Sequence, residues 1–190
     1  MLWVDFLPIF LFLVKNSLWR NNLQIFSFLT ASFLTQIISL LLVYRGYENI
    51  LLIKFYSVFS SLIIFYFFYS RLKLRKGYLL VNILLLCLIG FYSFRKSFEI
   101  HFILINSLIL VNSLFSLIYS LKQNIIFSLI DNSFIYSLLF YYSASIVIVY
   151  ILPIINEDSR QIWIVHNLIE MISKLIIAYS IWKLPSKSVS

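Results

Sequence analysis

An acid and a base stand close together inside an apolar segment near the end of the chain. Residues 161–183 form a near-continuous apolar stretch of membrane-spanning length that contains His166, Asn167, Glu170 and Lys174. Glu170 precedes Lys174 by four residues, which is the favourable orientation for an ion pair within one helix. An ionised side chain near the centre of a bilayer costs about 2.5–3.5 kcal/mol, so such residues often mark ion pathways or ligand sites. These four residues are therefore candidate ion-binding or ligand-binding residues.

The polar residues of this segment fall on one side of a helix. At 100° per residue they form a continuous stripe, and the opposite side is apolar. The stripe contains Trp163, Asn167, Glu170, Lys174, Ala178 and Ile181, with His166 and Ser173 at its edge. We expect the stripe to face other helices or a water-filled cavity and the apolar side to face lipid.

Three interpretations of this stripe remain open. In the first, Glu170 and Lys174 neutralise each other and only order the helix bundle. In the second, the stripe is a proton relay, an ion pathway or a ligand site, in which His166 titrates or donates a hydrogen bond. In the third, the stripe contacts a partner subunit.

Polar residues in three earlier segments could meet the last helix. They are Thr35, Gln36 and Ser39, then Ser60 and Ser61, and finally Asn106 and Asn112. Such residues usually hydrogen-bond across membrane helices, for about 0.6 kcal/mol on average. Ordinary helix–helix packing is thus the favoured interpretation, and Gln36 is added to the candidate ligand-binding residues.

The composition defines the class of protein. Of the 190 residues, 62% are hydrophobic and 12% are charged, which exceeds the apolar content that a soluble domain of this size can bury. We predict an all-α, polytopic transmembrane helix bundle, with residues 1–190 as a single domain. The lipid bilayer is the expected partner. The net charge of +8 does not indicate nucleic-acid binding, because the basic residues cluster in short loops, where they set topology.

Seven apolar segments approach the length needed to cross about 30 Å of hydrocarbon. They cover residues 2–18, 22–44, 47–70, 77–94, 97–121, 131–152 and 161–183. The first is the weakest candidate, because it carries Asp5, Pro8 and Lys15 and its apolar core is short.

The basic residues of the loops predict the orientation. Alternate loops and the C-terminus carry nine Lys and Arg residues on one side and four on the other, and cytoplasmic loops are enriched in these residues. The C-terminus is therefore predicted in the cytoplasm. Seven spans would place the N-terminus outside, and only that end changes side if the first segment does not span.

The loop RLKLRK is the strongest charge cluster of the chain. Its basic residues are Arg71, Lys73, Arg75 and Lys76. They could bind anionic lipid head groups, at about 1 kcal/mol per residue, although a plain topology determinant is the favoured interpretation.

Neither a catalytic site nor a cofactor is predicted. The histidines, His101 and His166, lie on different segments, and Cys87 stands alone. Three glycines in total cannot build a phosphate-binding loop. Lys174 lies on the last helix, as a retinal Schiff-base lysine does, but the middle of segment 47–70 has no acidic counter-ion. An enzyme is therefore not favoured.

The last two segments carry a resemblance to a known family. IYSLLFYYSASIVIVYIL and IWIVHNLIEMISKLIIAYSIWK resemble an uncharacterised family of small, roughly seven-helix membrane proteins common in Bacteroidetes-type bacteria. The residues that carry the resemblance are Trp163, His166, Asn167, Ala178, Ile181 and Trp182. It implies a multi-pass protein of a bacterial inner membrane. The chain departs from the family pattern at Glu170 and Lys174, where neutral polar residues are expected, and at Gln36, where an acid is frequent.

Two functions remain open at this point. The first is binding of a small solute, for sensing or transport, at the polar stripe of the last helix. The alternative is a non-catalytic accessory subunit that packs against a larger membrane complex or another copy of the chain.

Overall fold

The computed structural model describes residues 2–15, 18–155 and 159–184, and this part of the chain is entirely helical apart from its connections. The helices are α1 (Leu2–Val14), α2 (Leu18–Asn21), α3 (Leu23–Tyr44), α4 (Ile50–Arg71), α5 (Lys76–Phe94), α6 (Phe98–Lys122), α7 (Leu129–Ile155) and α8 (Ser159–Lys183). The predicted all-α class is confirmed, and the helix bounds follow the predicted apolar segments closely.

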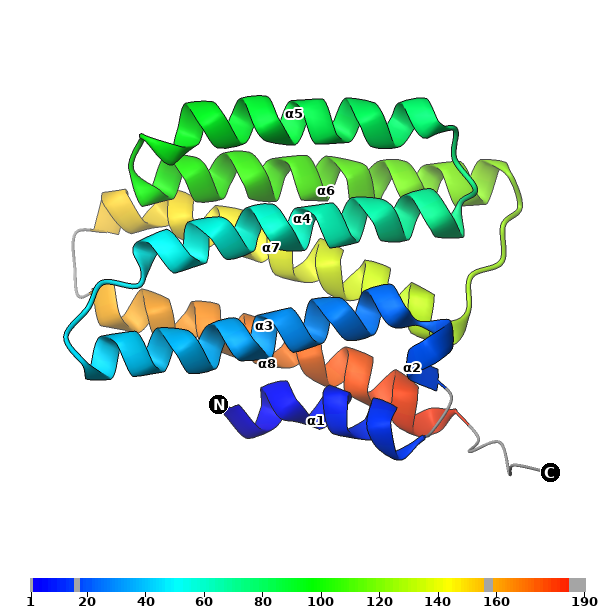
Figure 1. Ribbon diagram of the computed structural model, residues 1–190, viewed down its shortest axis with the longest axis horizontal. Helices are drawn as coiled ribbons and strands as arrows, with labels where there is room; N and C mark the ends of the chain where they lie inside the picture. The colour runs from blue at the N-terminus through cyan, green and yellow to red at the C-terminus, as the bar shows by residue number, and fades with distance from the viewer. Residues whose placement is uncertain (1, 16–17, 156–158, 185–190) are drawn as a thin grey trace.

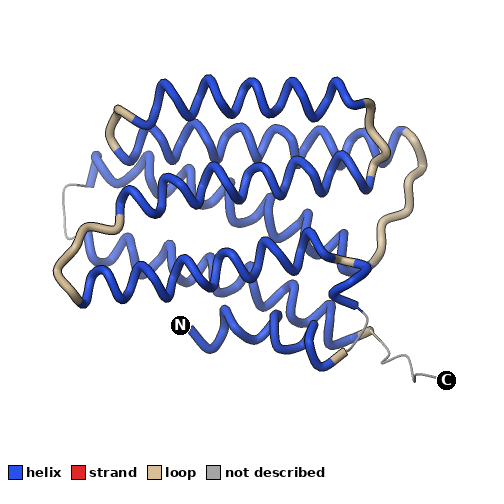
Figure 2. The backbone as a smooth tube through the Cα atoms, in the orientation of Figure 1, coloured by secondary structure: helices blue, strands red, loops and turns tan. Residues whose placement is uncertain are grey.

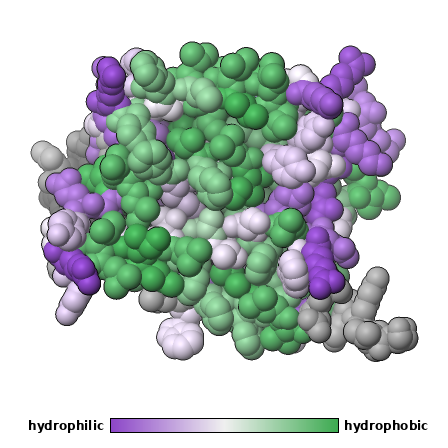
Figure 3. Space-filling view, in the orientation of Figure 1, coloured by the Kyte–Doolittle hydropathy of each residue, from purple (hydrophilic) through white to green (hydrophobic). Residues whose placement is uncertain are grey.

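Six helices of the described chain, α3 to α8, are long and apolar enough to cross a membrane. At 1.5 Å per residue, the 13 residues of α1 extend only about 20 Å, which is shorter than the hydrocarbon layer. The structure therefore gives six candidate spans and a short apolar helix in place of the seven predicted spans. In the space-filling view, an apolar belt separates two polar ends (Figure 3).

The long helices run side by side, and short connections make consecutive ones antiparallel (Figure 1). Six helices form a closed ring, in which each packs against the next: α1, α3, α4, α6, α7, α8 and again α1. Helix α5 lies outside this ring, against α4 and α6. Figure 2 shows the same arrangement as a tube. Because α1 is short, it occupies only part of the space between α3 and α8.

Helix α8 is oriented as its sequence pattern predicts. The residues of the polar stripe turn inward: His166, Ser173, Lys174, Ala178 and Ile181 are all buried. The opposite side is exposed at Ile164, Val165, Leu168, Ile172, Leu175 and Tyr179. The polar side of α8 thus faces the interior of the bundle, and its apolar side faces lipid.

The end of α1 is bound to the end of α8. The ammonium group of Lys15 donates hydrogen bonds to the carbonyl oxygens of Ile181 at 2.9 Å, of Trp182 at 2.6 Å, and of Leu184. The last carbonyls of a helix lack partners within that helix and carry partial negative charge. Lys15 therefore caps α8 and fixes α1 beside it, with both helices running in the same direction.

Aromatic side chains close the ring near the connection between α4 and α5. The ring of Phe134 on α7 packs edge-on against Phe67 of α4, with 4.9 Å between centroids, and against Phe28 of α3, with 5.4 Å. Phe67 and Phe134 are fully buried. This cluster forms an aromatic floor across the helix ring.

Candidate functional site

A cavity of about 380 Å³ lies inside the helix ring, above this aromatic floor. It separates α3 and α4 on one side from α7 and α8 on the other, and α6 contributes its third wall. Its polar lining comes from Ser32, Thr35, Gln36, Ser39, Asn49, Tyr56, Ser57, Ser60, Asn106, Ser137, Tyr141, Tyr142, His166, Asn167, Glu170, Ser173 and Lys174. The last helix supplies both of the charged side chains in this lining.

Lys174 lies at the centre of a three-charge cluster beside the cavity. Its ammonium nitrogen Nζ lies 2.6 Å from Glu170 Oε1 and 2.5 Å from Asp5 Oδ1. Gln36 donates its amide N–H to the same Glu170 oxygen at 2.9 Å. Side chains from α1, α3 and α8 therefore meet in one cluster around the Lys174 ammonium group.

The three-charge cluster carries one acid more than it has bases. If all three groups are ionised, Asp5 and Glu170 together contribute two negative charges and Lys174 one positive charge. The side chains of Asp5 and Lys174 are only 2% and 6% exposed, whereas that of Glu170 is 19% exposed. Asp5 lies behind Lys174, away from the cavity lining, so Glu170 is the acid that the cavity meets.

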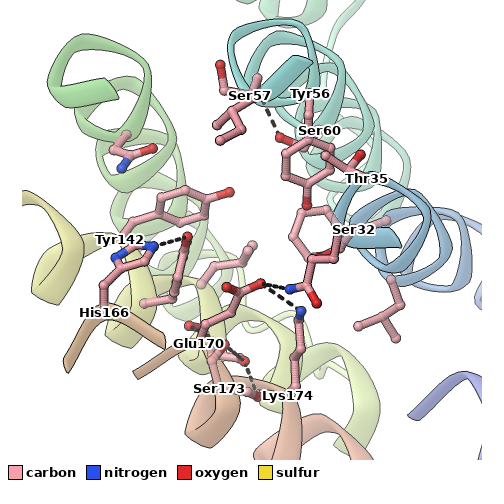
Figure 4. Close-up of a pocket in the computed structure, with 18 of the residues that line it drawn as sticks. Ser32, Thr35, Tyr56, Ser57, Ser60, Tyr142, His166, Glu170, Ser173 and Lys174 are labelled. Carbon is pink, nitrogen blue, oxygen red and sulfur yellow. Dashed lines mark hydrogen bonds and ion pairs between the residues drawn. The ribbon is translucent and has the colours of Figure 1, made fainter. Parts of the chain in front are cut away.

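Figure 4 shows how the polar side chains reach the cavity. Glu170 extends from α8, between Lys174 and His166, while Tyr56 extends from α4 on the other side. The phenol oxygen of Tyr141 lies 3.3 Å from His166 Nε2. Nearby, the hydroxyl groups of Ser137 and Ser173 lie 2.7 Å apart and link α7 to α8.

The cavity extends from the aromatic floor toward the connection between α3 and α4. Phe28 and Phe134 line it at the floor, and Asn49, in that connection, lines it at the opposite end together with Ser39. Asn49 also hydrogen-bonds the hydroxyl group of Ser39. The cavity therefore extends to the α3–α4 end of the bundle.

Most of the polar residues that were expected to meet the last helix do so. Gln36 hydrogen-bonds Glu170, and Thr35, Ser39, Ser60 and Asn106 line the same cavity. Two residues do not reach it. Ser61 donates to the carbonyl oxygen of Ser57, and Asn112 accepts a hydrogen bond from Tyr78 of α5 at 2.7 Å. Trp163 lies outside the residues whose side chains are described.

The sequence pattern alone did not indicate Asp5 or the tyrosines as residues of the site. Asp5 interrupts a short apolar segment, and an acid in such a segment is itself a signal of an intramembrane partner. Tyr56, Tyr141 and Tyr142 carry no such signal, because tyrosine is common throughout this chain and occurs widely at membrane interfaces.

The RLKLRK loop divides into two parts. Arg71 is engaged within the protein: its Nε lies 3.1 Å from Asp131 Oδ1, and it donates to the carbonyl oxygen of Asn21 at 2.9 Å and to Asn22 Oδ1 at 2.8 Å. Lys73, Arg75 and Lys76 are exposed. Arg71 thus connects α4 to the start of α7 and to the α2–α3 connection, whereas the other three face the surroundings.

A second buried polar group lies between α4, α5 and α6. The ring of His101 lies 2.8 Å from Ser57 Oγ through Nε2 and 2.8 Å from Ser93 Oγ through Nδ1. Lys54 donates to the carbonyl oxygens of Phe94 at 3.0 Å and Lys96 at 2.9 Å. These contacts attach α5 to the ring and direct the Lys54 charge toward the α5–α6 connection.

In the described part of the chain, no three His, Cys, Asp or Glu side chains come together as a metal site would require. No protein-family model, no curated protein and no solved structure matches the chain. The fold and the site define a multi-pass helical membrane protein with a polar cavity inside its bundle, and the family resemblance of the last two segments stays a prediction.

Proposed function

We propose that this membrane protein binds a small polar solute in its intramembrane cavity, as a transporter or a sensor does. The observation that carries the proposal is the surplus carboxylate at Glu170, which borders a cavity of about 380 Å³. A self-sufficient Glu170–Lys174 pair would need neither the second acid nor the empty volume. Intramembrane ionisable groups that face a cavity are typical of substrate and ion pathways.

The roles of the side chains follow from their contacts. Glu170 contacts the solute, and Lys174 and Gln36 hold its carboxylate in place. Asp5 compensates the charge of Lys174 from behind. His166, which is buried beside Tyr141, provides a further hydrogen-bonding group on the same wall, and Asn167 borders the solute on α8.

We infer from the distribution of the basic residues that the cavity faces outward. The ends with Lys15, Arg71 to Lys76, Lys122 and Lys183 lie at the floor side of the bundle, and this excess of basic residues supports a cytoplasmic location for that side. Because α1 runs in the same direction as α8 and Lys15 lies at the end of α8, the end of α1 would then lie at the cytoplasmic side, and its start would lie part-way along the bundle (Figure 1). The cavity then opens outward at the α3–α4 connection, across a bacterial inner membrane if the family resemblance holds.

Ligand-dependent thermal stability tests the proposal. The purified protein in lipid nanodiscs is heated with sets of small amino acids, sugars, carboxylates, amines and nucleosides, because a ligand that binds only the folded state raises the Tm. We expect at least one solute to raise the Tm and Glu170→Gln to abolish that rise. Glu99→Gln is the matched control, since Glu99 is exposed at the start of α6.

Two results would contradict solute binding. One is the absence of any Tm rise in all sets. The other is a rise that survives Glu170→Gln unchanged. Purification in mild detergent distinguishes the alternative function, because an accessory subunit would co-purify with a stoichiometric membrane partner whose release lowers the Tm of both proteins.

A further inference from the structure

We propose that the solute is a small organic cation, with an amine or quaternary ammonium group that binds Glu170 and the surrounding aromatic rings. This inference rests on the proposed solute-binding function and specifies its ligand class. Three independent features of the cavity carry it: the surplus charge, the aromatic lining and the volume together with one unpaired amide.

The charge of the site favours a cation. Asp5 and Glu170 both contact Lys174 Nζ, at 2.5 Å and 2.6 Å, so one negative charge remains uncompensated when all three groups are ionised. The other buried lysine of the described chain, Lys54, donates to carbonyl oxygens toward the α5–α6 connection. Arg71 already pairs with Asp131. A cation at Glu170 therefore completes the charge balance of the bundle interior.

The aromatic lining suits an organic cation better than an inorganic one. The rings come from Phe28, Tyr56, Phe102, Phe134, Tyr141 and Tyr142. Ammonium groups are attracted to the faces of such rings, most strongly when both are removed from water. Tyr56 and Glu170 reach into the cavity from opposite walls (Figure 4), so an ammonium group between them would meet a carboxylate on one side and a ring on the other.

The cavity volume and one unpaired amide group indicate that the ligand is larger than a single inorganic ion. A cavity of about 380 Å³ has room for about a dozen water molecules, at roughly 30 Å³ each, and so admits an amine with a short organic body. Asn106 lines this cavity on α6, is 2% exposed, and its Nδ2 has no hydrogen-bond partner within the described residues. A buried amide N–H without a partner is costly. An oxygen acceptor on the organic body, such as a hydroxyl group, would satisfy it.

Isosteric pairs that differ only in charge test the ligand class. The probes are choline against 3,3-dimethyl-1-butanol, in which carbon replaces the ammonium nitrogen, and tyramine against 4-propylphenol, in which a methyl group replaces the ammonium group. Binding to the wild-type protein in nanodiscs is measured by calorimetry at constant ionic strength. We expect at least one cation to bind about tenfold or more tightly than its neutral partner, as a charge-assisted contact provides.

Substitutions of cavity residues then test whether the preference for the cation arises in the cavity. Glu170→Gln should reduce the discrimination between cation and neutral partner to near unity, and it leaves the Asp5–Lys174 pair balanced. Tyr56→Leu should weaken the cation more than its neutral partner, since a cation loses the ring face. Glu99→Gln removes an exposed acid and should change neither affinity.

The outcomes separate this inference from the proposed function. Equal affinity within both pairs, binding of neither cation at millimolar concentration, or preference for an anion such as 4-hydroxyphenylacetate overturns the cation assignment. If Glu170 binds a proton and is neutral, the affinities within each pair would be equal. If another class of solute still raises the Tm in a Glu170-dependent manner, solute binding stands and only the ligand class is wrong. The comparison within each pair uses wild-type protein, so a variant that fails to fold does not affect it.

Discussion

Asp5 and Lys174 are 169 positions apart in the sequence, yet Asp5 Oδ1 lies 2.5 Å from Lys174 Nζ. Both residues are almost completely buried. The contact joins the first helix to the last and closes the helix ring on the side where α1 is too short to span. It also changes the chemistry of α8, because Lys174 is shared between two acids and Glu170 is left with part of its charge facing the cavity.

The shared lysine predicts an asymmetry between two substitutions in α8. Lys174→Met leaves Asp5 and Glu170 without a cation in the bundle interior, and breaking a buried ion pair in this way costs about 3–5 kcal/mol. Glu170→Gln leaves a balanced Asp5–Lys174 pair and should cost only about 1 kcal/mol. Thermal unfolding in a single detergent, followed by fluorescence-detected size exclusion, measures both effects.

A compensating variant controls this prediction. The triple variant Asp5→Asn, Glu170→Gln and Lys174→Met removes both acids together with the lysine. It leaves the cluster neutral and should recover most of the stability that Lys174→Met alone loses. The double variant Glu170→Gln with Lys174→Met retains Asp5 and should recover less. If the double variant is as stable as the wild type, Asp5 is not a partner of Lys174, and the isolated i,i+4 pair suggested by the sequence would be the correct description.

Lys15 gives a prediction for the opposite end of the same helices. Lys15→Met removes the donor for the carbonyl groups of Ile181, Trp182 and Leu184, and a cation at a helix C-terminus is worth up to about 2 kcal/mol. The last turn of α8 should exchange its amide hydrogens faster, as mass spectrometry would detect. Lys183→Met, at an exposed position of the same helix end, should have a much smaller effect. Equal exchange in the two variants would contradict the capping role.

We predict different roles for the two parts of the RLKLRK loop: Arg71 stabilises the fold, and the other basic residues bind lipid. Arg71→Gln breaks the contact with Asp131, whose side chain is 6% exposed, and should lower the free energy of unfolding by about 1–3 kcal/mol. The combined change of Lys73, Arg75 and Lys76 to Gln should leave the Tm nearly unchanged and weaken binding of anionic lipid by about 1 kcal/mol per residue. Titration of the detergent-solubilised protein with phosphatidylglycerol measures the second effect. A triple variant with unchanged lipid affinity would leave these residues as topology determinants only.

The sequence predicted those features that depend on one helix at a time. Apolar length predicted six of the candidate spans, and 100° periodicity predicted which side of α8 is buried. The i,i+4 spacing predicted the contact between Glu170 and Lys174. Each of these depends on local geometry that is the same in every α-helix.

The features that the sequence did not predict depend on which helices become neighbours. Asp5 reaches Lys174 because α1 packs along α8, and no periodicity within either segment specifies that neighbour. Asn112 was expected near the last helix and instead meets Tyr78 of α5, because one side of α6 faces α5 and the other faces the ring. The cavity itself is a vacancy between helices, so it has no residue pattern of its own.

The orientation in the membrane gives the last prediction. If the floor side of the bundle is cytoplasmic, the α3–α4 connection is outside and the α6–α7 connection is inside. Glu48→Cys and Gln123→Cys place single thiols at exposed positions of these two connections, in a background where the exposed Cys87 is replaced by alanine. A membrane-impermeant maleimide should label Glu48→Cys in intact cells and label Gln123→Cys only after the membrane is permeabilised. The reverse pattern would place the cavity mouth in the cytoplasm, and the solute would then have to come from inside the cell.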